Sequence, residues 1–373
     1  MIIYFFIVFG VYFALVLLLI TGWQIALEKP EQKSITTTYN KISVVVPFRN
    51  EENNLPKLLD GLLRQSYSKD NYEVILVDDH STDRSNLLVS SFCAGNPNFR
   101  LLNLGADQQG KKRALALAIE KATGGVIVTT DADCTVPKDW LVKINCSFQD
   151  GKTMVAIGAV KIEPDSSFFS RLQAIEFSSL IGSSAATLSY GVPTMCNGAN
   201  LAFRKTAFVE VGGYEGNLDI ASGDDEFLMR KISKHFPKAI SFIPETDSVV
   251  STLAHQTLAG FVNQRIRWAG KWKYSHSLSS KLLAIFIFVF QFSYLSLLLF
   301  LIGGWIPLKV GGLLVAIKFL LEFLFLYNIG VFLKLKWRWL PFFCLQFIYP
   351  LYVLWVAFGT EMRGFDWKGR KGG

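Results

Sequence analysis

The apolar residues of the chain are gathered into long runs near both ends. Met1–Ile20 contains no charged residue and is long enough to span a bilayer as a helix, at about 1.5 Å per residue. Three more apolar segments follow residue 281, at Leu282–Ile302, Gly311–Leu333 and Leu340–Phe358. This pattern predicts a transmembrane anchor over 1–27, a C-terminal membrane region over 281–359 and a basic tail over 360–373.

Shorter apolar runs alternate with amphipathic stretches in the segment between. Ile42–Val46 and Val74–Val77 are rich in β-branched residues, and Leu55–Leu63 between them is amphipathic. A further apolar run covers Val126–Thr130. Strands that alternate with helices are typical of an α/β domain with a mixed, mostly parallel sheet, and we place this domain at 40–275.

Acidic residues follow each of these predicted strands. Glu51 comes after the first run, Asp79 after the second, and Asp131 and Asp133 after the run that ends at Thr130. Because the carboxyl ends of parallel strands meet at one edge, these carboxylates would converge where open α/β sheets bind ligands. Such convergence needs a compensating cation, and paired aspartates suit Mg²⁺ or Mn²⁺ carrying a diphosphate. Taken alone, Asp-x-Asp is just as typical of a solvated turn.

The composition supports a membrane protein. The chain has 373 residues, of which 51% are hydrophobic, and its mean hydropathy of +0.32 is too high for an ordinary soluble enzyme. The formal net charge is +8, but the basic residues gather beside the membrane segments. Anionic lipid headgroups or a phosphorylated substrate therefore account for the charge, and no nucleic-acid partner is expected.

The basic residues also predict a topology. They crowd the approach to the second apolar segment and the connection between the last two, which places both loops in the cytoplasm and the N-terminus outside. Four full crossings would then leave the basic tail outside, against the rule. Either the last segment, which contains Pro341 and Pro350, is re-entrant or interfacial, or one predicted span is wrong. Lys318 and Glu322, four apart within one segment, are predicted to pair.

Several motifs follow one another in a fixed order between residues 41 and 268. They are Val-Val-Val-Pro-Phe-Arg-Asn-Glu-Glu at 44–52, Val-Asp-Asp-His-Ser-Thr-Asp at 77–83, Gly-Lys-Lys-Arg-Ala-Leu at 110–115, Asp-Ala-Asp at 131–133, Asn197–Arg204, Gly-Asp-Asp-Glu at 223–226 and Gln-Arg-Ile-Arg-Trp at 264–268. This order resembles the family-2 inverting glycosyltransferases, which have the GT-A fold. The last motif is similar to that of membrane polysaccharide synthases, including the poly-N-acetylglucosamine synthase type.

The resemblance implies a role for each matching residue. Glu51 and Asp79 would contact the base and ribose of the nucleotide, and Lys111 would lie near the diphosphate. Asp131 would face the nucleotide, and Asp133 would hold the metal, Mg²⁺ or Mn²⁺. On the acceptor side, the resemblance implies Asp225 as catalytic base and assigns contacts with the acceptor and the diphosphate to Asp224, Gln264, Arg267 and Trp268.

The implied activity is transfer of a hexosyl or N-acetylhexosaminyl group from a nucleotide-diphosphate sugar, above all a UDP-sugar. The acceptor would be lipid-linked or a growing polysaccharide of the cell envelope, and the enzyme would be a multi-pass protein of the cell membrane with its catalytic domain in the cytoplasm. Displacement of the diphosphate needs a base for the acceptor hydroxyl and a cation for the leaving group. Asp224 and Glu226, beside Asp225, would favour proton uptake through like-charge repulsion.

Two other functions stay open at this point. A membrane subunit that binds nucleotide sugars without turnover would keep the same motifs, although the intact Asp133 and Asp225 argue against it. A nucleotidyltransferase would need a Gly-rich basic loop after the first strand, where this chain has Pro-Phe-Arg-Asn-Glu-Glu. The chain also departs from the family: Asp224 replaces the usual glutamate, and the few membrane segments would make a polymer pore narrow or require a membrane partner subunit.

Overall fold

The computed structural model describes residues 1–28, 39–218, 223–270, 278–362, 365–367 and 370–372. The chain divides into two compact units. We call Ala26–Glu163 with Thr187–Leu253 the sheet unit, and Met1–Ile25 with Pro164–Ala186 and Ala254–Gly373 the helix unit. The domain boundaries expected from the sequence stay predictions.

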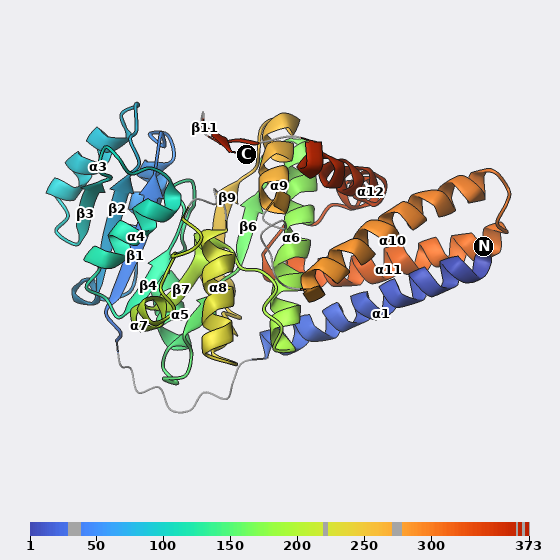
Figure 1. Cartoon of the computed structure of the whole chain (residues 1–373), viewed down its shortest axis with the longest axis horizontal. Helices are drawn as coiled ribbons and strands as arrows, with labels where there is room; N and C mark the ends of the chain where they lie inside the picture. Colours follow the sequence, from blue (N-terminus) through green and yellow to red (C-terminus); the bar gives the residue numbers. More distant parts are fainter. Residues whose placement is uncertain (29–38, 219–222, 271–277, 363–364, 368–369, 373) are drawn as a thin grey trace. The chain divides into compact units, whose positions relative to one another are not determined.

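A mixed seven-stranded sheet forms the centre of the sheet unit (Figure 1). Its strands lie in the order β3-β2-β1-β4-β7-β5-β8, and β1 to β4 are parallel to one another. Only β7 runs antiparallel to its neighbours, so the sheet is mostly parallel, as predicted. The strands are β1 (Ile42–Phe48), β2 (Tyr72–Asp78), β3 (Phe99–Asn103), β4 (Val126–Thr129), β5 (Val155–Ile157), β7 (Leu201–Arg204) and β8 (Ile240–Phe242).

One hydrophobic core of the sheet unit lies between this sheet and the helices α4 (Lys111–Lys121) and α8 (Asp224–His235). All seven side chains of β1 are buried, as expected for a central parallel strand covered on both faces. A separate parallel pair consists of β6 (Val160–Glu163) and β9 (Val250–Leu253). The helices are α2 (Leu55–Leu63), α3 (Ser85–Ala94), α4 (Lys111–Lys121), α5 (Trp140–Ser147), α7 (Lys205–Glu210) and α8 (Asp224–His235), with short 3₁₀ turns at Lys69–Asn71, Gly198–Asn200 and Thr246–Ser248.

The register of the parallel strands places three loops at one edge of the sheet. β1 pairs with β2 so that Phe48 lies opposite Asp78, and with β4 so that Val45 lies opposite Thr129. The chain therefore leaves these neighbouring strands on the same side. The acidic residues identified in the sequence lie in the loops that follow these three strands.

The helix unit contains long apolar helices. Among the residues that the structure describes, four helices are long and apolar enough to cross a membrane, at Ile2–Leu27, Lys281–Ile302, Leu308–Phe332 and Trp339–Gly359, close to the predicted spans. Pro350 lies inside the last helix without ending it. The elements are α1 (Ile2–Leu27), α6 (Phe168–Ser189, whose last residues belong to the sheet unit), α9 (Leu258–Gly270), α10 (Leu278–Ile302), α11 (Leu308–Phe332), α12 (Trp339–Met362), β10 (Phe365–Trp367) and β11 (Arg370–Gly372).

Polar side chains join the apolar helices near their middles. The Lys318 Nζ lies 2.8 Å from an oxygen of Glu322, as predicted, and donates to Gln346 of α12 at 2.6 Å. Tyr12 of α1 donates to the same Glu322 carboxylate at 2.6 Å. Because a lone charge is costly in hydrocarbon, these contacts make the pair tolerable and hold α1, α11 and α12 together.

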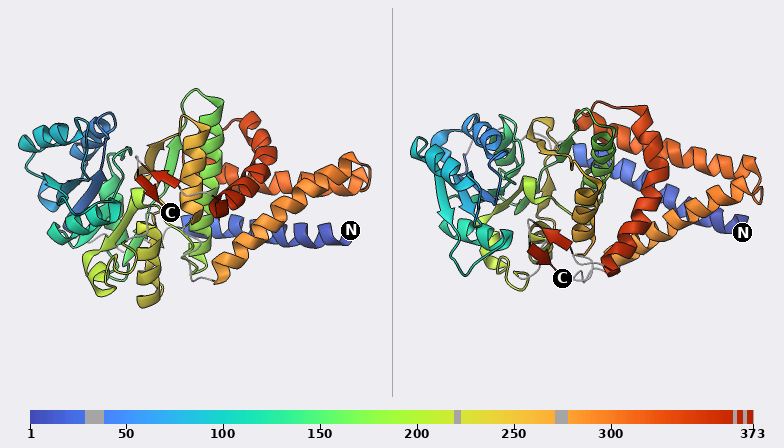
Figure 2. Two further views of the ribbon diagram at one scale, coloured as in Figure 1. Left: turned by 45° about the horizontal axis from the view of Figure 1, so that its top comes forward. Right: turned by 90° about the horizontal axis from the view of Figure 1, so that it is seen from above.

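Within the helix unit, α12 runs in a different direction from the other apolar helices. α1 lies alongside the hairpin formed by α10 and α11, whereas α12 runs across them (Figure 1, Figure 2). Phe343 of α12 packs on Phe319 of α11, and Phe358, farther along, packs on Phe288 of α10. Tyr352 of α12 packs on Phe261 of α9.

Candidate functional site

The loops after β1 and β2 are tied together by hydrogen bonds. Glu51 accepts from the Asn54 amide at 2.7 Å, and its backbone N–H donates to the Ser85 hydroxyl at 2.7 Å. Asp79 is 2% exposed, and its Oδ2 accepts from the Gly110 N–H at 3.0 Å. Asp78, by contrast, accepts from Ser81 and Asn86 and so stabilises the turn itself.

Lys111 lies between two of the predicted acidic residues. Gly110 precedes it with φ of 101°, a left-handed conformation that glycine adopts without strain, and α4 begins at Lys111. The Lys111 Nζ lies 2.7 Å from Asp131 Oδ1 and 3.3 Å from Asp224 Oδ2. Burial alone would lower the pKa of Lys111, but Asp131 and Asp224, with Asp225 beyond them, raise it well above its usual value. The lysine is therefore a fixed positive charge between carboxylates.

The loop before β7 holds the second aspartate of α8. Asp225 Oδ2 accepts from the Gly198 N–H at 2.9 Å, and its Oδ1 accepts from the N–H of Glu226 at 2.7 Å. The Gly198 carbonyl in turn accepts from the Thr129 hydroxyl, at the end of β4, at 2.6 Å. The two N–H donors therefore fix the position of the Asp225 carboxylate, and the Gly198 loop connects it to the end of β4.

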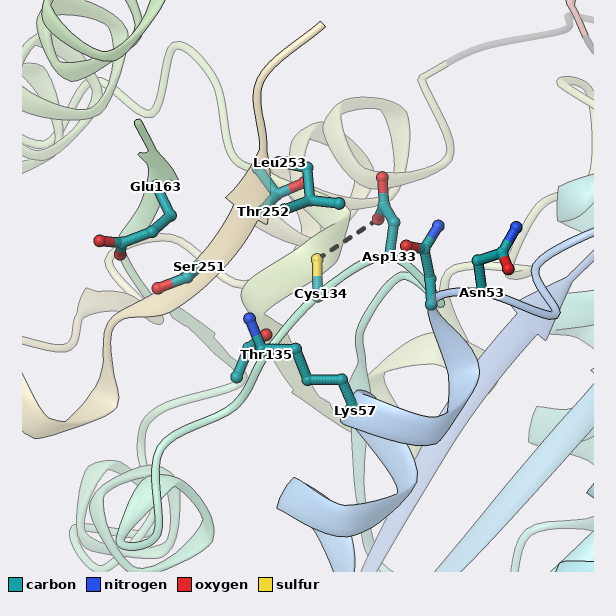
Figure 3. A pocket seen from close by; sticks show the side chains of 10 residues that line it. Asn53, Lys57, Asp133, Cys134, Thr135, Glu163, Ser251, Thr252 and Leu253 are labelled. Carbon is teal, nitrogen blue, oxygen red and sulfur yellow. Dashed lines mark hydrogen bonds between the residues drawn. The ribbon is translucent and has the colours of Figure 1, made fainter. Parts of the chain in front are cut away.

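Asp133 lines a polar pocket of the sheet unit (Figure 3). The neighbouring Cys134 thiol donates to Asp133 Oδ1 at 3.6 Å, and burial, then Asp133 and Asp131, raise the pKa of that thiol well above its usual value. The thiol is consequently protonated and unreactive at neutral pH. The other lining residues are Asn53, Asn54, Lys57, Thr135, Glu163, Ser251, Thr252 and Leu253.

Sequence comparison relates this arrangement to a known family. The profile described as glycosyl transferase family 2 matches residues 43–212. This range includes β1 except its first residue, β2, β4, Lys111, Asp131 and Asp133. The chain carries a family 2 glycosyltransferase domain. The sequence resemblance to this family is thereby confirmed.

Two curated relatives are similar to this chain in sequence. Poly-beta-1,6-N-acetyl-D-glucosamine synthase of Staphylococcus aureus (strain MSSA476) is 29% identical over 234 residues, which are 61% of this chain and 53% of the relative. Glycosyltransferase AglE of Haloferax volcanii is 33% identical over 107 residues, 29% of this chain and 35% of the relative. The chain thus spans about half the length of the synthase and about a third of AglE.

A solved structure shares the fold. The mannosyltransferase PcManGT from Pyrobaculum calidifontis, solved in complex with GDP-Man and Mn²⁺, superposes with a TM-score of 0.64 at 19% identity, over 97% of this chain and 99% of that one. With the family match, this likeness confirms the predicted fold class, a mixed and mostly parallel GT-A domain flanked by apolar helices.

The acidic residues of the family 2 domain fit a metal that is shared with a substrate. Among the described residues, no group of three or more His, Cys, Asp or Glu side chains is arranged to hold an ion by itself. Mg²⁺ is commonly bound by one or two carboxylates together with substrate phosphates. Asp131 and Asp133 meet that requirement, since both follow β4 directly and both side chains are partly exposed.

The Gln-Arg-Ile-Arg-Trp motif lies outside the matched range, on α9 of the helix unit. Gln264 Oε1 accepts from Arg265 at 2.6 Å, and the guanidinium of Arg265 lies 4.4 Å from the ring centre of Trp268. Arg267 is in the last turn of α9 and is partly exposed. The motif therefore forms a connected group within its own unit.

Sequence reasoning missed two of these connections. It placed Lys111 near a diphosphate but not between Asp131 and Asp224, because residues on distant helices leave no pattern in the spacing. It also passed over Arg265, whose partner Glu176 lies on α6. The position of Arg265 inside the Gln-Arg-Ile-Arg-Trp motif was a signal for the second connection, whereas nothing in the spacing indicated the first.

Proposed function

We propose that this chain is an inverting glycosyltransferase that moves a sugar from a nucleotide-diphosphate donor, a UDP-sugar, to a lipid-linked or growing glycan acceptor. The observation that carries the proposal is the Lys111 ammonium held between Asp131 and Asp224 at the carboxyl edge of a family 2 domain. It links the motif proposed for the donor to the one proposed for the acceptor.

On the donor side, Glu51 and Asp79 are proposed to contact the base and ribose, and Asp131 the nucleotide. The position of Asp79 supports this role, because Asp79 follows β2 at the carboxyl edge of the sheet. Its buried carboxylate is held there by a hydrogen bond from the Gly110 N–H. The Lys111 ammonium lies 2.7 Å from Asp131 Oδ1. Its positive charge would therefore attract the diphosphate of a nucleotide that Asp131 contacts. Asp133 is the proposed residue for a divalent cation, Mg²⁺ or Mn²⁺.

Asp225 is the proposed base. The acceptor hydroxyl oxygen attacks the anomeric carbon, and its proton passes to an Asp225 oxygen. The bond from that carbon to the phosphate oxygen breaks, and the electron pair leaves with the diphosphate, which inverts the configuration. When bound, a divalent cation supplies charge stabilisation for the leaving diphosphate. The Gly198 N–H supports the role by holding the Asp225 carboxylate in a fixed position beside the loop before β7.

On the acceptor side, we propose that Asp224, Gln264, Arg267 and Trp268 contact the acceptor or the departing diphosphate. An indole stacks well on the apolar face of a sugar, and an arginine suits phosphate. The name of the S. aureus relative supports an N-acetylglucosamine polymer as product, and the ligands of the Pyrobaculum neighbour support a nucleotide sugar with a divalent cation. Whether one sugar or many are added per acceptor is decided by the products.

We further propose that the protein lies in the cell membrane with its family 2 domain in the cytoplasm. The four apolar helices support a multi-pass arrangement, and the basic loops beside them support this orientation. Membrane lipids are then direct neighbours of the helix unit.

Release of nucleotide diphosphate by the purified, detergent-solubilised protein tests the proposal. The donors are UDP- and GDP-sugars, supplied with Mg²⁺ or Mn²⁺ and native membrane lipids. Asp133→Ala and Asp225→Asn run beside the wild type, and Asp70→Asn, an exposed aspartate on a 3₁₀ turn, is the matched control. We expect one donor to support turnover, with kcat lowered about 10²–10⁴-fold in Asp225→Asn.

Each other outcome has a defined meaning. Full turnover in Asp225→Asn would remove Asp225 as the base. Tight, metal-dependent UDP binding without turnover on any donor would favour the non-catalytic binding subunit. A product with a single added sugar would show that the enzyme makes one transfer per acceptor. A ladder of products would show that it synthesises a polymer.

A further inference from the structure

Arg265 is buried in the helix unit with all of its guanidinium nitrogens engaged. Its side chain is 4% exposed and that of its partner Glu176, on α6, is 6% exposed. Nε and Nη2 of Arg265 donate to the two oxygens of Glu176, and the remaining nitrogen, Nη1, donates to Gln264 Oε1 at 2.6 Å. A bidentate pair of this kind fixes the plane of the guanidinium as well as its position.

The faces of the same guanidinium lie against aromatic rings. The Arg265 guanidinium carbon lies 4.4 Å from the ring centre of Trp268 and 4.6 Å from that of Phe261. Arginine stacks on aromatic faces because its charge is delocalised over a plane. The orientation of the Trp268 indole therefore depends on Arg265.

One face of α6 supports the whole group. Gln173, Glu176 and Phe177 are three and four residues apart and share a side of the helix. The Gln173 amide exchanges two hydrogen bonds of 2.9 Å with the backbone of His255, just before α9. Phe177 contacts Trp268, with ring centres 6.1 Å apart. The segment from His255 to Trp268 is thus held by α6 at its start, middle and end.

A buried ion pair can also serve stability alone, and the helix unit contains such a case. Lys318 is 3% exposed and Glu322 is 17% exposed, and the two pair at 2.8 Å, but none of their described contacts reaches Gln264 or Trp268. Arg265 differs because two of its contacts are residues to which the proposed function assigns acceptor or diphosphate binding.

We propose that Arg265 is a positioning residue for the acceptor side of the reaction. Anchored by Glu176, it holds the Gln264 amide and the Trp268 indole in the orientation that receives the acceptor, and it does not touch the reacting atoms. The assignment rests on the proposed function. It predicts that loosening Arg265 harms the use of the acceptor while binding of the nucleotide is retained.

The test compares Arg265→Lys and Glu176→Gln with Glu322→Gln in the full chain. Arg265→Lys keeps the charge but loses the planar fork and the stacking, and Glu176→Gln keeps the shape but removes the anchoring charge. Transfer is measured with the UDP- and GDP-sugar panel, using total membrane lipid and N-acetylglucosamine oligosaccharides as acceptors. UDP affinity and the unfolding temperature are measured on the same preparations.

We expect both variants near Trp268 to lower kcat/KM for the acceptor about 10- to 100-fold, the range for a misplaced positioning group, with UDP affinity unchanged. Glu322→Gln should lower the unfolding temperature without changing kcat/KM. Equal kcat/KM in all variants after correction for the folded fraction would overturn the assignment. A wild type that transfers no sugar would instead refute the proposed function, and this assignment with it.

Discussion

At the scale of single residues, Lys111 is the side chain on which the charge balance of the sheet edge depends. Replacing it with methionine leaves Asp131 and Asp224 without their shared cation. Because hydrogen bonds to charged groups contribute more than neutral ones, we expect Lys111→Met to lower the free energy of unfolding by about 1–3 kcal/mol. Urea denaturation of the full-length protein in detergent measures this loss.

Lys121→Met is the matched control for that prediction. Lys121 lies at the other end of α4, and its ammonium pairs with the neighbouring Glu120 at the surface, where ion pairs contribute little. If Lys111→Met were no less stable than Lys121→Met, the bridge between Asp131 and Asp224 would have no energetic role.

His255, beside Gln264, gives the helix unit a sensitivity to acid. Burial lowers the pKa of His255 below its usual 6.5, and the nearby Arg265 and Arg267 lower it further, whereas a hydrogen bond with Gln264 raises it. Well above pH 6.5 the imidazole is neutral in both the folded and the unfolded chain, so its titration does not change the free energy of unfolding. As the pH falls below 6.5 the unfolded chain binds a proton before the folded one, so stability decreases until the folded pKa is passed.

The measurement is the unfolding temperature of the full-length protein between pH 8 and pH 5. We expect the wild type to lose more stability over this interval than His255→Gln, which stays neutral throughout. Parallel curves for the two proteins would show that His255 titrates alike in the folded and unfolded chains.

At the scale of elements, the entry into β4 depends on a glycine that touches β1. A Cβ on Gly124 would lie 2.6 Å from the Ser43 nitrogen and 2.7 Å from the Ile42 carbonyl carbon, both backbone atoms that cannot move aside. We expect Gly124→Ala to cost about 1–3 kcal/mol through overpacking, measured by thermal unfolding. Gly125→Ala is the control, since nothing lies within 4 Å of its Cβ position.

A small cost for Gly124→Ala, similar to that for Gly125→Ala, would mean that β4 can shift along β1. Such a shift would also move Asp131 and Asp133, which follow β4 directly. The glycine therefore connects the register of the sheet to the position of the proposed donor site.

The elements that could be predicted from the sequence are those with a strong local pattern. β1 and α2 were recognisable from a β-branched run and an amphipathic stretch, and the acids after β1, β2 and β4 could be assigned to one edge because parallel strands end together. The antiparallel course of β7 was not predictable. Its direction depends on pairing with β4 and β5, which are distant in the sequence.

The contacts within the candidate site follow the same rule. The position of Asp131 was predictable because it is adjacent to a strand. The bridge from Lys111 to Asp224 and the pair of Arg265 with Glu176 were not, because each joins helices brought together only by tertiary packing. The local sequence pattern thus identifies the charged residues that follow strands. Tertiary packing determines which charged side chains form pairs.

At the scale of the whole molecule, the course of α12 bears on the conflict in the predicted topology. α12 runs across α1, α10 and α11 (Figure 2). Its large exposed side chains recur every three or four residues. They are Trp339, Leu340, Phe343, Phe347, Ile348, Leu351, Trp355 and Phe358. Because α12 runs across the other three apolar helices, it would lie along the membrane surface if those three cross the bilayer.

We therefore predict three crossings, by α1, α10 and α11, with α12 interfacial. The N-terminus and the connection between α10 and α11 would be outside. The loop with Lys336 and the tail with Lys371 would both be cytoplasmic, so every basic segment obeys the positive-inside rule.

Thiol labelling in intact cells tests this arrangement, in a background where the five native cysteines are serine. A membrane-impermeant maleimide should label Lys309→Cys, at the exposed start of α11, in intact cells. It should label Lys336→Cys and Lys371→Cys only after permeabilisation. Labelling of Lys371→Cys but not Lys336→Cys in intact cells would mean that α12 crosses the bilayer, and the positive charge of the tail would then be an exception to the rule that orients the rest of the chain.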